Sequence, residues 1–361
     1  MKLTAMLRAF GGMLLIACLA FTLSACEGEE GPEGPQGPAG PQGPQGEQGE
    51  KGDPGTDGED GEAGTAGCVQ CHDVSATVKA IAVQYEASKH GSGMTFERNG
   101  TSCAPCHTHQ GFVEVLETGQ GSTAASIMNP APVNCRTCHN IHVNYDQSDY
   151  SLATSDPVTM FTGETYDMGS SNLCANCHQP RSADLPEIDG PDFEVTSVRF
   201  GPHHGPQSSL LIGASLIKLP GSVSYSSMNS HENVDDGCLT CHMAEAYGAQ
   251  SGGHTFSMGY DYHGHTVGNT AGCESCHGEI EDFDINGAVT EIEGYLAQLK
   301  ALLEAEGCLD EEGYAVPGTY GANLAAALWN YRYIALEDRS MGIHNPRLVK
   351  AVLQNSIEAV Q

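Results

Sequence analysis

The pattern of apolar and polar positions is clearest near the C-terminus, where it predicts an amphipathic helix. Apolar residues recur there at steps of three and four, with charged residues between them. They are Ile292, Tyr295, Leu296, Leu299, Leu302 and Leu303. Thr290 and Glu293 have the spacing of a capping box at the start of this helix, and Gly307 is expected to end it.

Two further helices are predicted after Gly307. A run of apolar residues predicts a helix over 323–336, and Asn345 followed by Pro346 has the N-cap and first-turn residues that begin a third. We therefore expect residues 283–361 to form a helical bundle. Cys308 lies between the first two helices and is expected to be structural rather than catalytic.

The stretch 68–282 has no sustained periodicity of either kind. Segments rich in Gly, Ser, Pro and Asn interrupt it, and the candidate helices are short. One is 73–88, where the residues on one face are Val78, Ile81, Ala82 and Tyr85. The fold class predicted for the chain is mostly α with extensive loops and little β. Aromatic residues make up only 6% of the sequence, which leaves few large side chains to build a core.

The same stretch carries one motif six times: two cysteines separated by two residues, followed directly by a histidine. The copies are Cys68-Val-Gln-Cys71-His72, Cys103-Ala-Pro-Cys106-His107, Cys135-Arg-Thr-Cys138-His139, Cys174-Ala-Asn-Cys177-His178, Cys238-Leu-Thr-Cys241-His242 and Cys273-Glu-Ser-Cys276-His277. This is the attachment signature of c-type haem, in which two thiols form thioethers with the porphyrin and the histidine is the proximal iron ligand. The sequence therefore predicts six c-type haems.

Zinc sites or a disulfide framework are the alternatives for paired cysteines. Zinc ribbons also use Cys-x-x-Cys, but they need no histidine directly after the second cysteine. Twelve of the 15 cysteines are used by the motifs, which leaves Cys18, Cys26 and Cys308.

The sixth iron ligand decides whether a haem transfers electrons or binds a substrate. Ten histidines lie outside the motifs, enough to close all six sites. The choice among them is guided by a resemblance to the multihaem c-type cytochromes, which implies His90, His142, His204, His231, His254 and His344 as the distal ligands. The runners-up are His203, His263, His265 and His109, with methionine ligation by Met94, Met243 or Met258 as a further alternative.

The motifs and several of these histidines together resemble the multihaem c-type cytochromes over residues 68–361. The blocks that carry the resemblance, besides the motifs, are Ser88-Lys89-His90-Gly91, His142 after His139, Gly201–Gln207, Gly253-His254-Thr255-Phe256 and Asp338–Pro346. The resemblance implies a haem-packed domain over 68–282, a distal ligand from the C-terminal region and electron transfer between closely spaced haems.

Residues 1–25 are predicted to be an export leader rather than part of the fold. Lys2 and Arg8 are followed by an apolar stretch that is short for a membrane span. The segment Leu23-Ser24-Ala25-Cys26 resembles a bacterial lipobox, which implies cleavage before Cys26, lipidation of its thiol and, with Glu27, sorting to the outer membrane. The alternative is an ordinary secretory signal; in both cases the protein is exported.

The regular spacing of glycine predicts that residues 26–67 form a stalk. Glycine occupies every third position from Gly28 to Gly67, and proline fills several of the others, which is the Gly-X-Y pattern of collagen. A triple helix of three chains is the favoured interpretation. A single-chain acidic spacer in the extended polyproline conformation is the alternative.

The formal net charge of −31 limits the partners of the chain. It excludes nucleic acid and direct docking on anionic lipid, so that membrane contact is expected through the lipid anchor only. The function that these features predict is extracytoplasmic electron transfer. The partners would be quinol-linked or other multihaem cytochromes as redox partner proteins, or an external electron acceptor, on the periplasmic or cell-surface face.

Two alternatives to a simple carrier remain. One is a multihaem reductase of a nitrogen or sulfur oxyanion with one open haem; the other is a subunit of a haem-stacked filament. A carrier rather than an enzyme is favoured, because the spare histidines are numerous enough to close every site.

Overall fold

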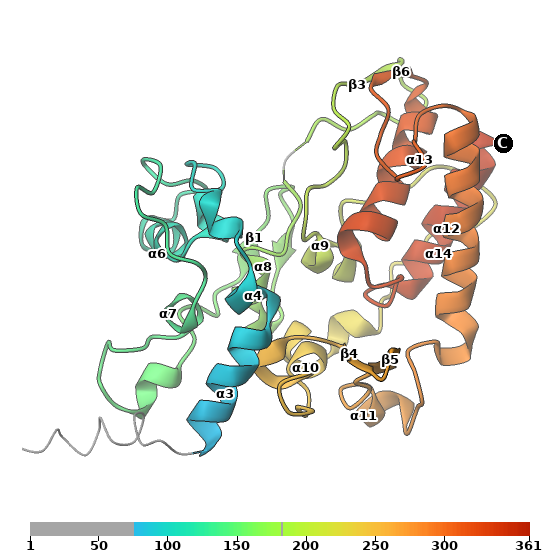
Figure 1. Ribbon diagram of the computed structural model, residues 1–361. Coiled ribbons are helices and arrows are strands. Elements are labelled where there is room, and N and C mark those ends of the chain that lie inside the picture. Colours follow the sequence, from blue (N-terminus) through green and yellow to red (C-terminus); the bar gives the residue numbers. More distant parts are fainter. Residues whose placement is uncertain (1–75, 182) are drawn as a thin grey trace, which may run out of the picture. The chain divides into compact units, whose positions relative to one another are not determined.

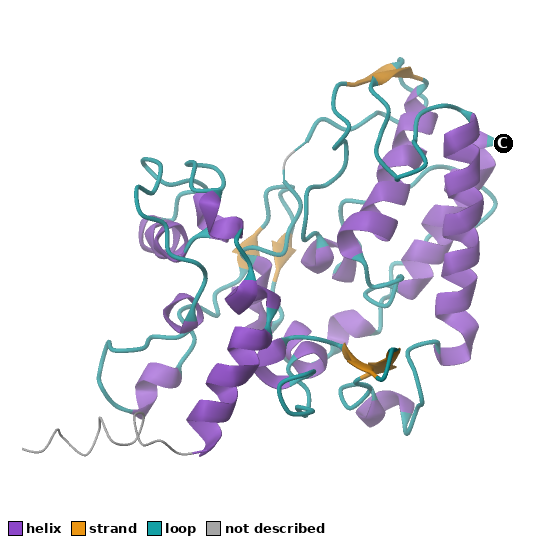
Figure 2. Cartoon of the chain, viewed as in Figure 1, coloured by secondary structure: helices purple, strands orange, loops and turns teal. Residues whose placement is uncertain are grey.

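The computed structural model describes residues 76–181 and 183–361, which all belong to one compact unit. The predicted leader, Cys26, the glycine repeat and the first motif (Cys68, Cys71 and His72) lie outside the described residues. The expectation of a mostly helical chain with extensive loops and little sheet is confirmed (Figures 1 and 2).

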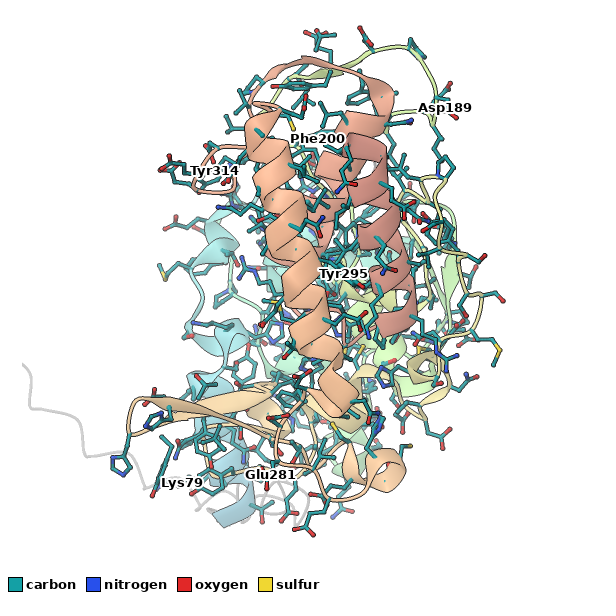
Figure 3. All side chains as sticks on the ribbon, turned by 90° about the vertical axis from the view of Figure 1, so that its right-hand side faces the viewer. Lys79, Asp189, Phe200, Glu281, Tyr295 and Tyr314 are labelled. Atoms are coloured by element: carbon teal, nitrogen blue, oxygen red, sulfur yellow. The ribbon has the colours of Figure 1, made fainter. Side chains whose placement is uncertain are left out.

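The C-terminal region contains three helices that pack against one another, as the apolar pattern predicts. They are α12 (Ala288–Ala305), α13 (Ala322–Arg332) and α14 (Pro346–Val360), and each packs against the other two (Figure 1). Their buried faces form the main apolar core, whose fully buried members include Ile292, Leu299, Leu303, Leu328, Ile334, Val352 and Leu353. Figure 3 shows Tyr295 of α12 beside α14, where the Gln354 amide donates to its hydroxyl (2.6 Å).

The ends of these helices correct two predictions. The first helix begins at Ala288, before Thr290, so the capping box is wrong; instead, the carboxylate of Asp284 accepts from the backbone N–H of Val289 (2.7 Å) and from the Thr290 hydroxyl (2.5 Å). The second helix changes at Tyr333 to a wider π-helical segment, Tyr333–Asp338. The third prediction is confirmed, because the Asn345 side chain accepts from the N–H of Leu348 (3.3 Å) at the start of α14.

The rest of the described chain is built from short helices joined by long loops (Figure 2). The α-helices are α3 (Ala76–Ala87), α4 (Lys89–Ser92), α5 (Ala104–His107), α6 (His109–Thr118), α7 (Cys135–Cys138), α8 (Asn172–Ala175), α9 (Gln207–Leu211), α10 (Cys238–His242) and α11 (Glu274–His277). Single 3-10 turns are η1 (Thr95–Glu97), η2 (Gln147–Tyr150), η3 (Gly169–Ser171), η4 (His231–Asn233), η5 (Gly253–Thr255) and η6 (Ile285–Gly287).

Sheet structure is limited to three antiparallel two-stranded ladders in the described chain. They pair β1 (Val158–Thr159) with β2 (Thr165–Tyr166), β3 (Phe193–Val195) with β6 (Gly318–Tyr320), and β4 (Gly259–Tyr262) with β5 (His265–Gly268). The β3–β6 ladder joins the loop region to the segment that precedes α13.

Buried apolar residues are distributed unevenly along the chain. Between residues 76 and 194 they are Ala104, Phe112, Val158, Met160, Tyr166 and Ala175. Side chains of α3 that the sequence placed on one face stay accessible, such as Ile81 at 36% exposure. The loops of this part therefore do not bury an apolar core comparable with that of the C-terminal bundle.

Asn330 ties the preceding loop to the bundle. It is fully buried on α13, where its amide oxygen accepts from the N–H of Ile217 (2.9 Å) and its amide nitrogen donates to the Ile217 carbonyl (2.8 Å). The same nitrogen lies 3.1 Å from the Ser356 hydroxyl on α14. One side chain thus satisfies both backbone groups of a buried loop residue.

We expect Asn330→Ala to lower the free energy of unfolding by about 2–4 kcal/mol, because the buried N–H of Ile217 loses its partner and the Ile217 carbonyl keeps only the N–H of Leu219 (3.1 Å). The matched control is Asn323→Ala on the same helix, where the Asn323 amide bonds Asp189 at an exposed position. That change should cost less than about 1 kcal/mol. Urea unfolding followed by far-UV circular dichroism measures both, and equal losses would contradict the role given to Asn330.

Candidate functional site

Each described motif forms, or borders, a single helical turn. Helices α5, α7, α10 and α11 cover most of the second, third, fifth and sixth motifs, whereas α8 ends at Ala175 inside the fourth, where the N–H of His178 still donates to the Cys174 carbonyl (2.9 Å). In such a turn, residues three and four apart share one face, so the two cysteines and the histidine of a motif are presented together. None of the cysteines of the described motifs forms a disulfide, and neither does Cys308, which is buried.

Every motif histidine that the structure describes faces one histidine from outside the motifs. The ring centroids of these pairs lie 6.0–6.4 Å apart. In motif order, the pairs are His107–His203 (6.4 Å), His139–His254 (6.3 Å), His178–His90 (6.0 Å), His242–His344 (6.3 Å) and His277–His231 (6.3 Å). We call these sites 2 to 6, after the number of the motif.

The spacing of the rings tests whether an iron fits between them. A bond from a transition metal to imidazole nitrogen is about 2.0 Å long, and the nitrogen lies roughly 1.2 Å from the ring centre. Two rings on opposite sides of one iron therefore have centroids roughly 6.4 Å apart. All five pairs come close to this value, so the residues fit a bis-histidine haem iron.

The second ring nitrogen of several histidines is held by a hydrogen bond. The Nδ1–H groups of His139 (2.7 Å), His231 (2.6 Å) and His242 (3.0 Å) donate to the backbone carbonyls of Tyr150, Ile343 and Phe256, respectively. The Nδ1–H of His178 donates to the Gln207 side chain (3.0 Å), and that of His344 donates to the Asp338 carboxylate (2.6 Å). Histidines that ligate metals are commonly oriented in this way, and the bond leaves Nε2 as the nitrogen for the iron.

Burial also favours the form of imidazole that binds iron. It lowers the pKa of His90 to about 4, with His178 adding to the effect. It lowers the pKa of His203 to about 4 as well, with Arg181 as the next cause. Neutral imidazole is the ligating form, so a low pKa leaves these rings ready to bind a metal at neutral pH.

His344 differs from the other histidines in its electrostatics. Burial disfavours its charged form, but the charge and hydrogen bond of Asp338 outweigh burial and raise its pKa. Asp338 is itself buried, and its carboxylate also accepts from the backbone N–H of Ser340 (3.1 Å). Among the five described sites, site 5 is therefore the one at which a carboxylate accepts a hydrogen bond from a histidine of the pair.

Four of the expected distal histidines face a motif histidine in the structure: His90, His231, His254 and His344. His204 does not. The neighbour of His204, His203, has a left-handed backbone (φ 67°) and faces His107 instead. The His204 ring is 70% exposed, and its Nδ1 lies 2.6 Å from the buried Glu337 carboxylate. The sequence favours His204 as the distal ligand, but the structure places the ring of His203, and not that of His204, opposite His107.

The remaining candidates have other surroundings. His142 stacks on Tyr145, with centroids 5.6 Å apart, and the Nδ1 of His109 lies 3.0 Å from the Thr137 hydroxyl. His263 and His265 are exposed in the β4–β5 hairpin. Met94 is 63% exposed.

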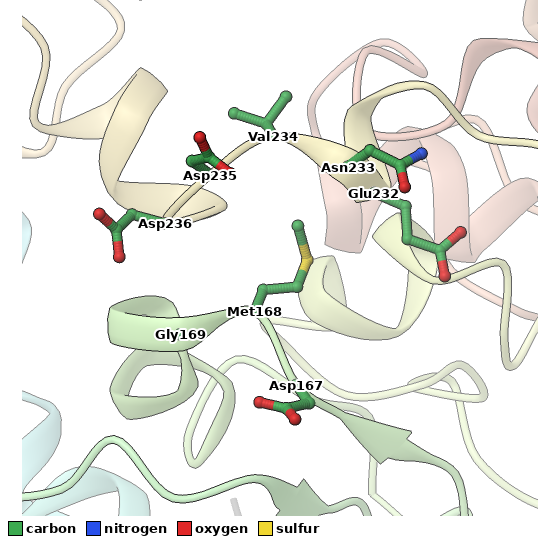
Figure 4. A pocket seen from close by; sticks show the side chains of 8 residues that line it. All are labelled: Asp167, Met168, Gly169, Glu232, Asn233, Val234, Asp235 and Asp236. Carbon is green, nitrogen blue, oxygen red and sulfur yellow. The ribbon is translucent and has the colours of Figure 1, made fainter.

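A surface pocket of about 370 Å³ lies beside site 5 (Figure 4). Four carboxylates line it, and Figure 4 shows the Met168 side chain among them. The full lining is Asp167, Met168, Gly169, Glu232, Asn233, Val234, Asp235 and Asp236. The described residues contain no group of three or more His, Cys, Asp or Glu arranged to hold a bare metal ion.

The chain was compared with known proteins. A family model described as collagen triple helix repeat (20 copies) matches residues 25–69. The prediction of a collagen-like segment is therefore confirmed. No curated protein and no solved structure matches the chain. Within the described ranges, every helix is too short or too polar to cross a membrane.

Proposed function

We propose that the chain binds six c-type haems covalently and transfers electrons outside the cytoplasm. The observation that carries the proposal is the pairing of every described motif histidine with a second histidine at 6.0–6.4 Å. A haem iron with nitrogen ligands on both faces supplies one-electron transfer and offers no position to a substrate.

The sparse core of residues 76–194 supports the same proposal. Few apolar side chains are buried there, although the chain is long enough to enclose a core. Porphyrins packed between the motif turns would supply the missing apolar bulk. This accounts for a compact unit that is made largely of loops.

The first site lies outside the described residues and is assigned by its motif alone. Cys68 and Cys71 would attach the haem, and His72 would be the proximal ligand. The sequence preference for His142 stands as the proposal for its distal ligand. At site 2 we propose His203 as the distal ligand in place of His204, because His203 is the ring that faces His107.

The N-terminal segments support a proposal for where this activity takes place. We propose that Cys26 is lipidated and that the collagen-like segment holds the haem region away from the outer membrane, as a homotrimer. Redox partner proteins or an external acceptor would then reach the haems without contact between the acidic chain and anionic lipid.

We expect His203→Ala to open one haem per chain, while His204→Ala leaves all six closed. The two histidines are adjacent, but His203 faces the motif ring and His204 bonds Glu337. Electron paramagnetic resonance should show one new high-spin ferric signal in the first variant, and its reduced form should bind carbon monoxide.

The reverse result would contradict the choice of His203. A stoichiometric high-spin signal in the unchanged protein would contradict closure of every site and favour an oxyanion reductase.

Asp338→Asn should raise the reduction potential of one haem by on the order of 50 mV, because a charge-assisted hydrogen bond to the His344 ring becomes a neutral one. The control is Glu337→Gln, which weakens an equally short bond (2.6 Å) to His204, a ring that faces no motif histidine. Potentiometric titration followed by visible absorbance compares the two. Equal shifts would contradict ligation by His344.

The mature chain should sediment as a trimer, and a shortened chain lacking residues 26–67 as a monomer. The reason is that three Gly-X-Y strands bury their glycines at a common axis, and the described unit is expected to be kept soluble by its acidic charge. Analytical ultracentrifugation measures both masses. A monomeric mature chain would favour the single-chain spacer.

A further inference from the structure

The motif turns touch one another in an order that differs from their order in the sequence. Sites 2 and 4 meet reciprocally. The thiol of Cys106 lies 3.8 Å from the Asn176 carbonyl, and the thiol of Cys177 lies 3.9 Å from the Pro105 carbonyl. Each second cysteine therefore lies against the backbone between the cysteines of the other motif.

Site 4 meets site 5 through its other cysteine. The side chains of Cys174 and Cys238 interact, and the fully buried Tyr166 hydroxyl joins the two motifs. It lies 3.5 Å from the Cys238 thiol and 2.9 Å from the hydroxyl of Ser171, just before α8. Gly237 permits this approach, because a β-carbon there would lie 2.5 Å from Ser171 Oγ.

Phe256 connects site 4 with site 3 as well. Its ring lies 5.1 Å from that of His90, the distal histidine of site 4, and 6.0 Å from that of His254, the distal histidine of site 3. Its carbonyl accepts from His242 of site 5 (3.0 Å). One residue with a left-handed backbone (φ 56°) therefore contacts histidines of three sites.

Site 6 meets only site 5 among these contacts. Gly272, just before the sixth motif, lies so close to the fifth that a β-carbon would be 2.8 Å from Cys241 Cα. On the distal side, the Nδ1–H of His231 donates to the Ile343 carbonyl, next to His344. Among the five described sites, sites 4 and 5 thus each have three neighbours, because Phe256 also links site 5 to site 3, and site 6 has one.

We propose that site 4 is the junction of a branched electron path, with sites 2, 3 and 5 around it and site 6 reached through site 5. The inference rests on the proposed function. Thioether sulfurs lie at the porphyrin edge, so motifs whose cysteines touch bring two porphyrin edges close together. Electron tunnelling falls steeply with the distance between edges, so these contacts set the order of transfer. Phe256 acts as a positioning residue at the junction.

The test replaces one distal histidine by methionine, which raises the potential of that haem. In His90→Met, site 4 becomes ferrous earlier in a titration, and its changed charge should shift the potentials of three other haems. The matched variant His231→Met makes the same change at site 6 and should shift the potential of one other haem. Potentiometric titration followed by electron paramagnetic resonance resolves the individual low-spin signals. A shift of one potential or none in His90→Met, or equal numbers in the two variants, would overturn the junction.

A second pair of variants keeps every iron ligand. Phe256→Leu should change the low-spin signals of at least two haems, and Phe256→Tyr should restore them. Phe200→Leu is the control, because the Phe200 ring contacts Phe193 and Trp329 in the bundle. Unchanged signals in Phe256→Leu would overturn the role of Phe256.

Failure of the proposed function would look different from failure of the junction. Fewer than six haems per chain in the unchanged protein, measured from the absorbance of the pyridine complex, would overturn the proposed function and the junction with it. Six low-spin haems with the wrong pattern of shifts would overturn the junction alone.

Discussion

The described part of the structure is organised by one constraint: each motif histidine from His107 to His277 meets a second histidine across about 6 Å. The two rings of a pair come from distant parts of the sequence, as in His139 with His254 or His242 with His344. The chain between the two histidines of a pair therefore has to bring the second ring back opposite the first. Regular helices and sheets would limit where those returns can occur, and this explains why most of the unit before α12 consists of single turns and loops.

The backbone angles near these histidines are consistent with the same constraint. His203, Phe256 and Arg339 have left-handed φ angles, which cost energy in residues other than glycine. His203 is itself one of the paired histidines, Phe256 contacts two of them, and Arg339 directly follows Asp338, which bonds His344. The C-terminal bundle supplies the rigid support for this region: the segment after α13 carries Asp338, and the turn before α14 carries His344. The core of the bundle and the histidine pairs are thus parts of one unit, although a boundary between them is visible in the sequence.

The bundle could be predicted because its signals are local. The apolar stripe of α12 and the Asn345 cap depend on residues within one or two turns, but Asp284, whose carboxylate accepts from the first turn of α12, lies outside the spacing of a standard motif. The distal histidines could be proposed only as a set. His203 and His204 are neighbours in sequence, and what separates them is one left-handed residue and the distant Glu337. The pairing of each motif with its partner is a long-range property that spacing does not contain.

Differences between the sites give the proposed path a direction. At site 5 a buried carboxylate bonds the His344 ring, which would stabilise ferric iron and lower the reduction potential. At site 2 the guanidinium of Arg181 lies 3.5 Å from the Cys103 thiol, a positive charge that would favour ferrous iron. Both of these sites contact the fourth motif or the residues directly before it. If the sites hold haem as proposed, electrons pass most readily from site 5 through site 4 to site 2, because charges placed by the fold lower the free energy of the electron in that order.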